Sequence, residues 1–167
     1  MNIQDILLIY EYNEWANHLI LDTAEKITPE QYVAPTSHSF GSLRGTLVHT
    51  LDTEWSWRLL LQTQVVAQEE ITETDLPTLE SLRQRWNEEE EAWREYLHSL
   101  TDADMTRIIR YAVPEGLVRE RVLWHCLYHV VNHGMQHRSE AAAMLTDYGQ
   151  SPGGLDFTFF MNQRAGQ

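Results

Sequence analysis

The sequence has little cysteine and few basic residues. Its single cysteine, Cys126, excludes an internal disulfide framework and any zinc site made of cysteines alone. It has 12 lysines and arginines against 25 aspartates and glutamates, a net charge of −13. Because no stripe of basic residues is available to replace phosphate counterions, this balance argues against nucleic acid and anionic membrane surfaces as partners. The chain also lacks an uninterrupted apolar run long enough to span a bilayer.

The rest of the composition is that of a globular protein. The chain has 167 residues, 43% hydrophobic and 22% charged, which suits one domain over residues 1–167 with one sizeable core. Its first residues are polar and acidic and lack the basic start of a targeting segment, so we expect a soluble, cytoplasmic protein. Its most unusual feature is eight histidines, several of them at helical spacing.

Four long segments place apolar residues on one helical face. We expect helices over residues 4–26, 43–62, 78–99 and 120–148. Ser42 is a suitable N-cap for the second helix, and Gly149 followed by Pro152 ends the fourth. The acidic, irregular residues 67–77 are expected to form an exposed long connection. This pattern favours an all-α fold, specifically a four-helix bundle.

Shorter segments are predicted from turn and strand signals. Residues 28–30 indicate that the first helix has ended and that a one-turn helix follows. Residues 105–118 contain a Pro-Glu-Gly turn signal and favour a short hairpin or extended excursion before the last helix. The glutamates at 88–91 are expected to face solvent, and the aromatic tail, 151–167, to pack back onto the body.

The last predicted helix carries four histidines spaced four residues apart: His125, His129, His133 and His137. Each step turns the side chain by about 40° and moves it about 6 Å along the axis, so adjacent members can bind one metal ion. His129 and His137 are about 12 Å apart along the axis, too far to share an ion. The series therefore predicts one pair of ligands completed by a residue from another segment.

We favour His133 and His137 as the pair, because Gly134 lets a neighbouring helix or an ion approach closely. His49, in an apolar stretch of the second predicted helix, is the candidate third ligand. His129 is an alternative partner of His133 or a neighbour of the site. Three neutral imidazoles suit zinc, nickel, copper or iron and leave coordination positions open, as in catalytic sites.

The other histidines and the cysteine have simpler interpretations. Cys126 is about 10 Å from His133 along the axis and is expected to be a small buried hydrophobic residue. The sequence has no His-Glu-x-x-His motif, Gly-rich phosphate loop or Gly-x-Ser-x-Gly elbow, so none of those chemistries is supported. The remaining histidines are expected at the surface: His18, His38, His98 and His125.

Three segments resemble the DinB/YfiT-like superfamily, small bacterial four-helix bundles with a three-histidine metal site. They are residues 12–17 (YNEWAN), 41–49 (GSLRGTLVH) and 129–138 (HVVNHGMQHR), which span nearly the whole chain in the family's order. The resemblance implies an up-down-down-up bundle that is frequently a homodimer. It also implies a divalent metal ion, most often nickel or zinc, bound by the histidines at 49, 133 and 137.

The chain departs from the family after His137 and Arg138. Many members continue with Gly-Gln, whereas Ser139 and Glu140 follow here. Glu140 lies three residues past His137, so it can place a carboxylate beside the site or face solvent. This departure weakens the transfer of any particular substrate from the family.

Other residues near the expected ligands are weaker candidates. Asp52, one turn after His49, can act as a hydrogen-bond acceptor or base, or be an ordinary surface acid. Arg138 and Asn132 can position substrate or make hydrogen bonds between helices. Three tryptophans are expected to pack within the bundle: Trp15, Trp55 and Trp57.

The resemblance implies a metal-dependent enzyme of thiol transferase or hydrolase type. In such an enzyme a small thiol or water, activated by the metal, attacks an electrophilic substrate. A second hypothesis is a metal-binding or stress-related dimeric protein without turnover. A third is a structural bundle whose histidines are buried polar anchors.

Overall fold

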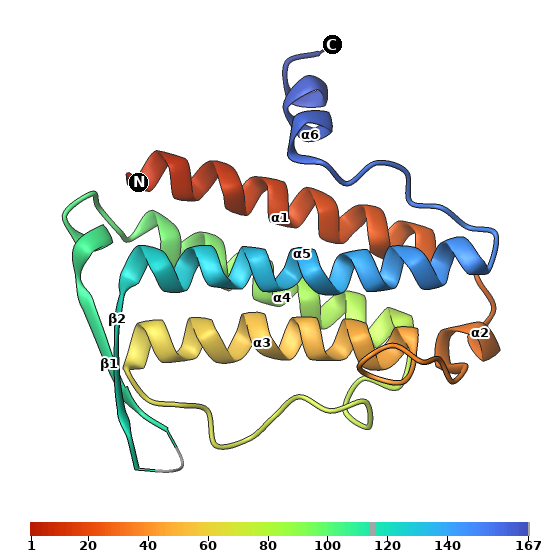
Figure 1. The fold of residues 1–167 in the computed structure, drawn as a ribbon, viewed down its shortest axis with the longest axis horizontal. Coiled ribbons are helices and arrows are strands. Elements are labelled where there is room, and N and C mark those ends of the chain that lie inside the picture. The colour runs from red at the N-terminus through yellow and green to blue at the C-terminus, as the bar shows by residue number, and fades with distance from the viewer. Residues whose placement is uncertain (114–115, 167) are drawn as a thin grey trace.

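The computed structural model describes residues 1–113 and 116–166, and it is mostly helical (Figure 1). The elements are α1 (Ile3–Ala24), α2 (Pro29–Val33), α3 (Leu43–Thr63), α4 (Leu79–His98), the 3₁₀ helix η1 (Asp104–Thr106), β1 (Ile108–Ala112), β2 (Val118–Val122), α5 (Leu123–Asp147) and α6 (Phe157–Arg164). The prediction of a mainly helical protein with four long helices is confirmed. No helix in the described ranges has both the length and the apolarity needed to cross a membrane.

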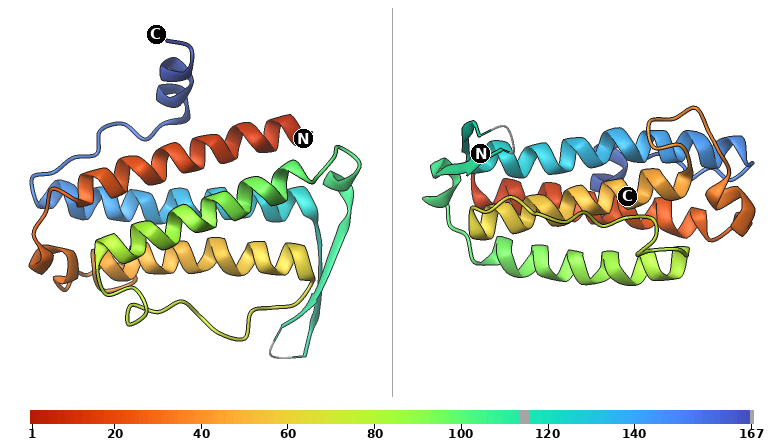
Figure 2. Two further views of the ribbon diagram at one scale, coloured as in Figure 1. Left: turned by 180° about the vertical axis from the view of Figure 1, so that it is seen from behind. Right: turned by 90° about the horizontal axis from the view of Figure 1, so that it is seen from below.

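The four long helices pack against one another in pairs. Both α1 and α3 contact α4 on one side and α5 on the other. In the view from below in Figure 2, α4 and α5 accordingly lie on opposite sides of α1 and α3. Figure 1 shows α1 and α5 running in one direction and α3 and α4 in the other. The adjacent pair α3 and α5 carries the histidines of interest.

Local sequence sets the helix starts. Asn2 and Thr78 form capping boxes at the first turns of α1 and α4, and Thr28 does so at the short α2. Ser42 accepts a hydrogen bond from the backbone nitrogen of Gly45 at 2.9 Å, as expected of an N-cap. At the end of α5, Gly149 adopts a φ of +77°, the left-handed conformation that glycine allows.

The last long helix begins later than predicted. Residues 120–122 belong to β2, which pairs antiparallel with β1, and Arg110 opposite Glu120 forms an ion pair of 2.7 Å. The backbone nitrogen of Leu123 donates to Arg107 at 2.9 Å, so the hairpin ends directly in the first turn of α5. Strand pairing satisfies backbone groups that an early helix start would leave open. The expected hairpin is confirmed, although its Pro-Glu turn residues, 114–115, lie outside the described residues.

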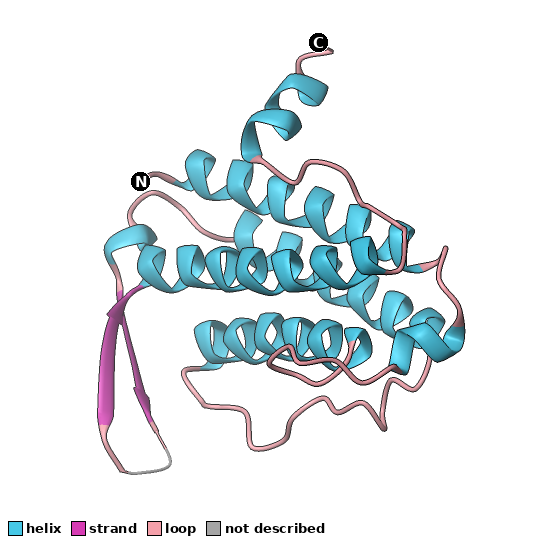
Figure 3. Ribbon diagram, turned by 45° about the vertical axis from the view of Figure 1, so that its right-hand side comes forward, coloured by secondary structure: helices cyan, strands magenta, loops and turns pink. Residues whose placement is uncertain are grey.

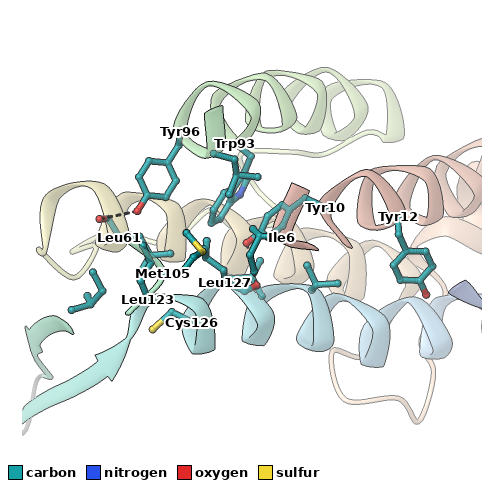
Figure 4. Close-up of a cluster of buried hydrophobic side chains, with 14 of the residues drawn as sticks. Ile6, Tyr10, Tyr12, Leu61, Trp93, Tyr96, Met105, Leu123, Cys126 and Leu127 are labelled. Carbon is teal, nitrogen blue, oxygen red and sulfur yellow. Dashed lines mark hydrogen bonds between the residues drawn. The ribbon is translucent and has the colours of Figure 1, made fainter. Parts of the chain in front are cut away.

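The core consists of two apolar clusters, one towards each end of the helices. In the first, Tyr10 packs on Trp93 with ring centroids 4.9 Å apart, and Tyr96 donates to the carbonyl of Leu61 at 3.3 Å (Figure 4). Cys126 belongs to this cluster and is 2% exposed, which confirms it as a buried hydrophobic residue. The second cluster is built around leucines of α3 with Trp86, Met144 and Leu145.

The expectation for glutamates 88–91 is wrong for two of the four. Glu89 and Glu90 are buried. Glu89 pairs with Arg58 and Arg85, while Glu90 lies 2.9 Å from Nε2 of His18. A run of four residues covers more than one full turn of helix, so part of it must face inward, where arginines and a histidine compensate the buried charge.

The aromatic tail packs onto the body, as predicted, and then forms α6. Phe160 is buried, with its ring 5.9 Å from Tyr12 and 5.7 Å from Trp15. The Tyr12 hydroxyl donates to the carbonyl of Leu155 at 2.8 Å. Phe159, on the other face of the helix, is 54% exposed. As Figure 3 shows, α6 projects away from the four long helices.

Candidate metal centre

The structure brings together three histidines from two adjacent helices. His133 and His137 lie one turn apart on α5, and His49 comes from α3. Nε2 of His133 lies 3.2 Å from Nε2 of His49 and 3.1 Å from Nε2 of His137. One ring nitrogen of each histidine lies within 4.8 Å of the other two. These three residues form the histidine cluster.

The spacing of these nitrogens suits a shared metal ion. Two nitrogens about 2.1 Å from one ion and about 90–110° apart lie about 3.0–3.4 Å from each other. A ring nitrogen carries at most one hydrogen, so three converging nitrogens cannot fully satisfy one another by hydrogen bonds. The donor set is therefore suited to a cation that prefers imidazole ligands, such as zinc or nickel.

Glu140 holds the ring of His137 in place. Its Oε2 lies 2.8 Å from Nδ1 of His137, and its Oε1 accepts a hydrogen bond from Ser39 at 3.2 Å. Desolvation opposes ionisation of Glu140, but these two hydrogen bonds lower the pKa of its carboxyl overall. With Nδ1 donating to this carboxylate, Nε2 of His137 has its lone pair directed at His133.

The other two imidazoles favour the neutral form. Burial, followed by the electrostatic interaction with His137, lowers the pKa of His49 to about 4. Burial is also the largest cause that lowers the pKa of His133 to about 4, with His137 and His49 next. Both rings therefore have a lone pair available at pH 7, which is the state that binds metal ions.

Sequence reasoning missed Phe40, which covers one flank of the histidine cluster. Its ring stacks on His49 with centroids 3.7 Å apart and an interplanar angle of 15°, and its centroid is 5.2 Å from that of His137. Phe40 lies in the connection between α2 and α3, which crosses in front of the first part of α3 in Figure 1. The available signal is an aromatic residue two positions before the N-cap, Ser42.

Two other histidines of α5 lie outside the histidine cluster. His129 is exposed, and its ring centroid is 6.0 Å from that of His133, so it is a neighbour of the site and not a member of the convergent pair. Burial lowers the pKa of His129. His125 is exposed, as predicted.

Asp52 is turned towards the connection between α3 and α4. Its Oδ1 accepts a hydrogen bond of 2.7 Å from the backbone nitrogen of Ile71. Burial is the largest cause raising the pKa of this carboxyl. Among the hydrogen bonds of the described residues, none joins Asp52 to an imidazole.

The space beside Gly134 is used by α1 and by Arg138, not by an ion. A Cβ at this position would lie 2.6 Å from Nη1 of Arg138 and 3.1 Å from Oδ1 of Asn13. Arg138 is 2% exposed and donates to the Oδ1 atoms of Asn13 and Asn17 at 2.6 and 2.8 Å. Two roles were predicted for Arg138, positioning substrate or making hydrogen bonds between helices. The structure shows the hydrogen bonds between helices. Asn132 is exposed.

Glu54 is the centre of a buried polar network that sequence reasoning also missed. Its Oε1 accepts hydrogen bonds from Asn13 at 2.8 Å and Asn17 at 3.1 Å, and its Oε2 accepts one from Trp86 at 2.9 Å. Arg138 completes this Glu54 network, which therefore contains a side chain from each long helix. In the sequence, these residues could have been recognised as polar side chains at positions where the helical period predicts buried, apolar residues.

Three imidazoles converge here from two adjacent helices. The protein therefore belongs to the class of helical proteins with a candidate three-histidine metal centre. The comparison with known proteins identifies the family within that class. The DinB family model matches residues 1–166, and the chain belongs to the DinB family. It is also similar to Protein DinB of Bacillus subtilis (strain 168), with 23% identity over 159 residues that cover 92% of this chain and 91% of that protein. The resemblance noted in the sequence is thus confirmed.

Proposed function

We propose that the protein is a metal-dependent enzyme of the DinB family, of thiol transferase or hydrolase type. His49, His133 and His137 hold a divalent ion, nickel or zinc, with coordination positions left open for a small thiol or water. The observation that carries this proposal is the convergence of three imidazole nitrogens within 4.8 Å. A metal ion held by these residues would act as a Lewis acid, which would lower the pKa of a thiol or water and so make it a better nucleophile.

Residues of the chain itself prepare the site for this chemistry. Burial keeps His49 and His133 neutral, and Phe40 excludes water from one flank. Glu140 is a positioning residue, because its hydrogen bond fixes the ring and the tautomer of His137. Asp52, one turn after His49 on α3, is also proposed as an acceptor or base, and the turnover rate of the Asp52→Asn variant tests that role.

Metal analysis of protein purified without a histidine tag tests the metal centre. We expect about one nickel or zinc ion per chain in the wild type and its loss in the His133→Ala variant. His129→Ala is the matched control, since this histidine lies on the same helix outside the histidine cluster. Absence of metal under every loading condition contradicts the proposal.

Turnover is tested by incubating metal-loaded protein with an electrophile and a panel of small thiols. We expect thiol consumption that depends on His133. A specific alternative is a non-catalytic metal-binding or stress-related bundle protein, which retains stoichiometric metal but consumes no thiol and hydrolyses no ester or amide. Those results decide between the two functions.

We also propose one domain over residues 1–167, an up-down-down-up four-helix bundle, that forms a cytoplasmic homodimer. Apolar side chains exposed on α5 and α6 support an interface between copies: Tyr128, Met135, Phe157, Phe159 and Met161. Light scattering is expected to give about twice the 19.5 kDa of the chain. A mass of one chain at micromolar concentration contradicts the dimer.

A further inference from the structure

A cavity of about 260 Å³ lies along the second half of α3, and its lining includes none of the three histidines. Its walls come from α3, from the connection between α3 and α4, and from the hairpin. Figure 1 shows this connection running beneath α3 and the hairpin descending beside the end of α3. The aromatic walls are Trp57 and Tyr111, and the acidic walls are Asp52, Glu69 and Glu70.

A row of rings joins this cavity to the histidine cluster. The ring centroid of Trp57 is 6.2 Å from that of Tyr111 and 5.0 Å from that of His129. The centroid of His129 is in turn 6.0 Å from that of His133. The row follows the contact between α3 and α5. Phe40 covers His49, whereas His129, the neighbour of His133 in this row, is exposed.

The chemistry of the cavity favours a cation with apolar substituents. Two aromatic rings attract a cation by their π faces, and three carboxylates attract it by charge. No lysine or arginine is among the described residues that line the cavity. Asp52 is half-buried, and burial, with repulsion from Glu70, raises the pKa of its carboxyl. A bound cation would offset that repulsion, whereas an anion would add to it.

We propose that this cavity binds an organic ammonium group, carried on an apolar stem, at the far end of a substrate whose reactive end reaches the histidine cluster. The position of the reactive end rests on the proposed function, whereas the ligand class of the cavity does not. His49 and Ser56, a residue of the cavity wall, are seven residues apart on α3, which is about 10 Å along the axis. The stem must span a comparable distance.

Calorimetric titration tests the ligand class with three probes of one chain length: hexyltrimethylammonium, hexanol and hexanesulfonate. We expect the ammonium ion to bind more tightly than the alcohol, and the sulfonate not to bind. The same order is expected for metal-loaded, metal-free and His133→Ala protein, because the cavity contains none of the three histidines. Equal binding of the three probes, or no binding of the ammonium ion, overturns the proposal.

Two tryptophan variants locate the ammonium site. Trp57→Leu is expected to weaken ammonium binding about fivefold or more. Trp15→Leu is the matched control, because Trp15 is a partly buried tryptophan of α1 that packs on Phe160 and does not line the cavity. Equal weakening by both variants overturns the assignment. Thermal melts check that each variant is folded.

A double variant, Asp52→Asn with Glu70→Gln, tests the contribution of charge. The asparagine keeps an oxygen that can accept the hydrogen bond from Ile71, so the connection stays in place. We expect weaker ammonium binding and unchanged hexanol binding. Unchanged ammonium binding in a folded double variant overturns the role of the carboxylates.

Thiol substrates separate this proposal from the proposed function. Metal-loaded protein is given aminooctanethiol, octanethiol and the shorter aminoethanethiol with one electrophile. We expect the long aminothiol to be consumed fastest, and Trp57→Leu to remove its advantage. Thiol consumption without any preference for charge and length overturns the cavity proposal and leaves the proposed function. Ammonium binding without consumption of any thiol, and without hydrolysis of an ester or amide, overturns the proposed function and supports the ligand class of the cavity.

Discussion

Two polar clusters of this protein share helices α3 and α5 and have opposite properties. The Glu54 network is buried, and both oxygens of Glu54 and the amide oxygens of Asn13 and Asn17 accept hydrogen bonds. The histidine cluster begins only five residues away on α3, and on α5 His137 is the residue next to Arg138. Its nitrogens converge at 3.1–3.2 Å without enough hydrogens to pair with one another.

The difference shows that the supply of hydrogen-bond partners distinguishes a polar cluster with a structural role from one that can bind a ligand. A saturated network between two apolar clusters fixes the four helices relative to one another, because leaving one of its groups unpaired is costly. An unsaturated cluster beside solvent retains binding capacity. Changes in the Glu54 network should therefore affect stability most, and changes in the histidine cluster should affect metal binding most.

The largest expected effect is that of Arg138→Met on stability. Removing the guanidinium leaves the buried Oδ1 atoms of Asn13 and Asn17 without this donor and removes the positive charge that favours ionisation of the buried Glu54, which together should cost about 3–5 kcal/mol in the free energy of unfolding. Urea denaturation measures this loss. Arg110→Met is the control, because the ion pair of Arg110 with Glu120 is exposed and is expected to contribute about 0–1 kcal/mol. Similar losses in the two variants would remove the distinction between the clusters.

The next effect is stabilisation by metal. A metal ion at about a hundredfold excess over its dissociation constant should raise the free energy of unfolding of the wild type by about 2.7 kcal/mol. His133→Ala should lose this response while its metal-free stability changes little, because the ring is partly exposed. Thermal melts with and without nickel or zinc provide the measurement. A full response in the variant would show that the ion binds elsewhere.

Glu140 should have a smaller effect, confined to metal affinity. Glu140→Ala removes the acceptor for Nδ1 of His137 and is expected to weaken metal binding about 10–100-fold. Glu140→Gln offers an amide oxygen to the same nitrogen and should recover most of that affinity. Competition with a chelator measures both constants. Wild-type affinity in the alanine variant would contradict the positioning role.

The smallest effect concerns the pH dependence of the metal-free protein. Folding lowers the pKa of His49 and of His133 from 6.5 to about 4, so below pH 6.5 the folded state binds fewer protons than the unfolded state. Stability from these groups is therefore fully present above pH 6.5 and is lost as the pH falls towards 4. Melting temperatures across this range test the direction. A His133→Gln variant should have a shallower dependence, and an equal slope would assign the effect to other groups.

Much of the fold could be predicted from local signals. Helical periodicity and the caps Ser42 and Gly149 located the long helices closely, because these signals act within a few residues. The predicted start of α5 was wrong, because residues 120–122 pair with β1, a partner that the helical pattern of the segment itself does not reveal. The inward direction of Glu89 was missed for a similar reason, since Arg58 comes from another helix.

The candidate site was predicted unevenly. The spacing of four between His133 and His137 is a property of one helix, so it was readable from the sequence. The family resemblance supported His49 as their neighbour. Glu140 was an open candidate until the structure placed its carboxylate on His137. Phe40 was missed, because its place before the N-cap is a weak signal and a residue in a connection has no periodicity that indicates its direction.

The sequence alone determined which residues are chemically able to bind a metal, where the long helices run and which family the chain resembles. Tertiary structure alone decided which imidazoles converge, that Arg138 and Glu54 lie in a saturated network, and that Trp57 lies between His129 and Tyr111. The physical reason is the distance along the chain over which each interaction acts. Helix propensity, capping and periodicity act over a few residues, whereas the partners of a buried side chain are set by how separate helices pack against one another.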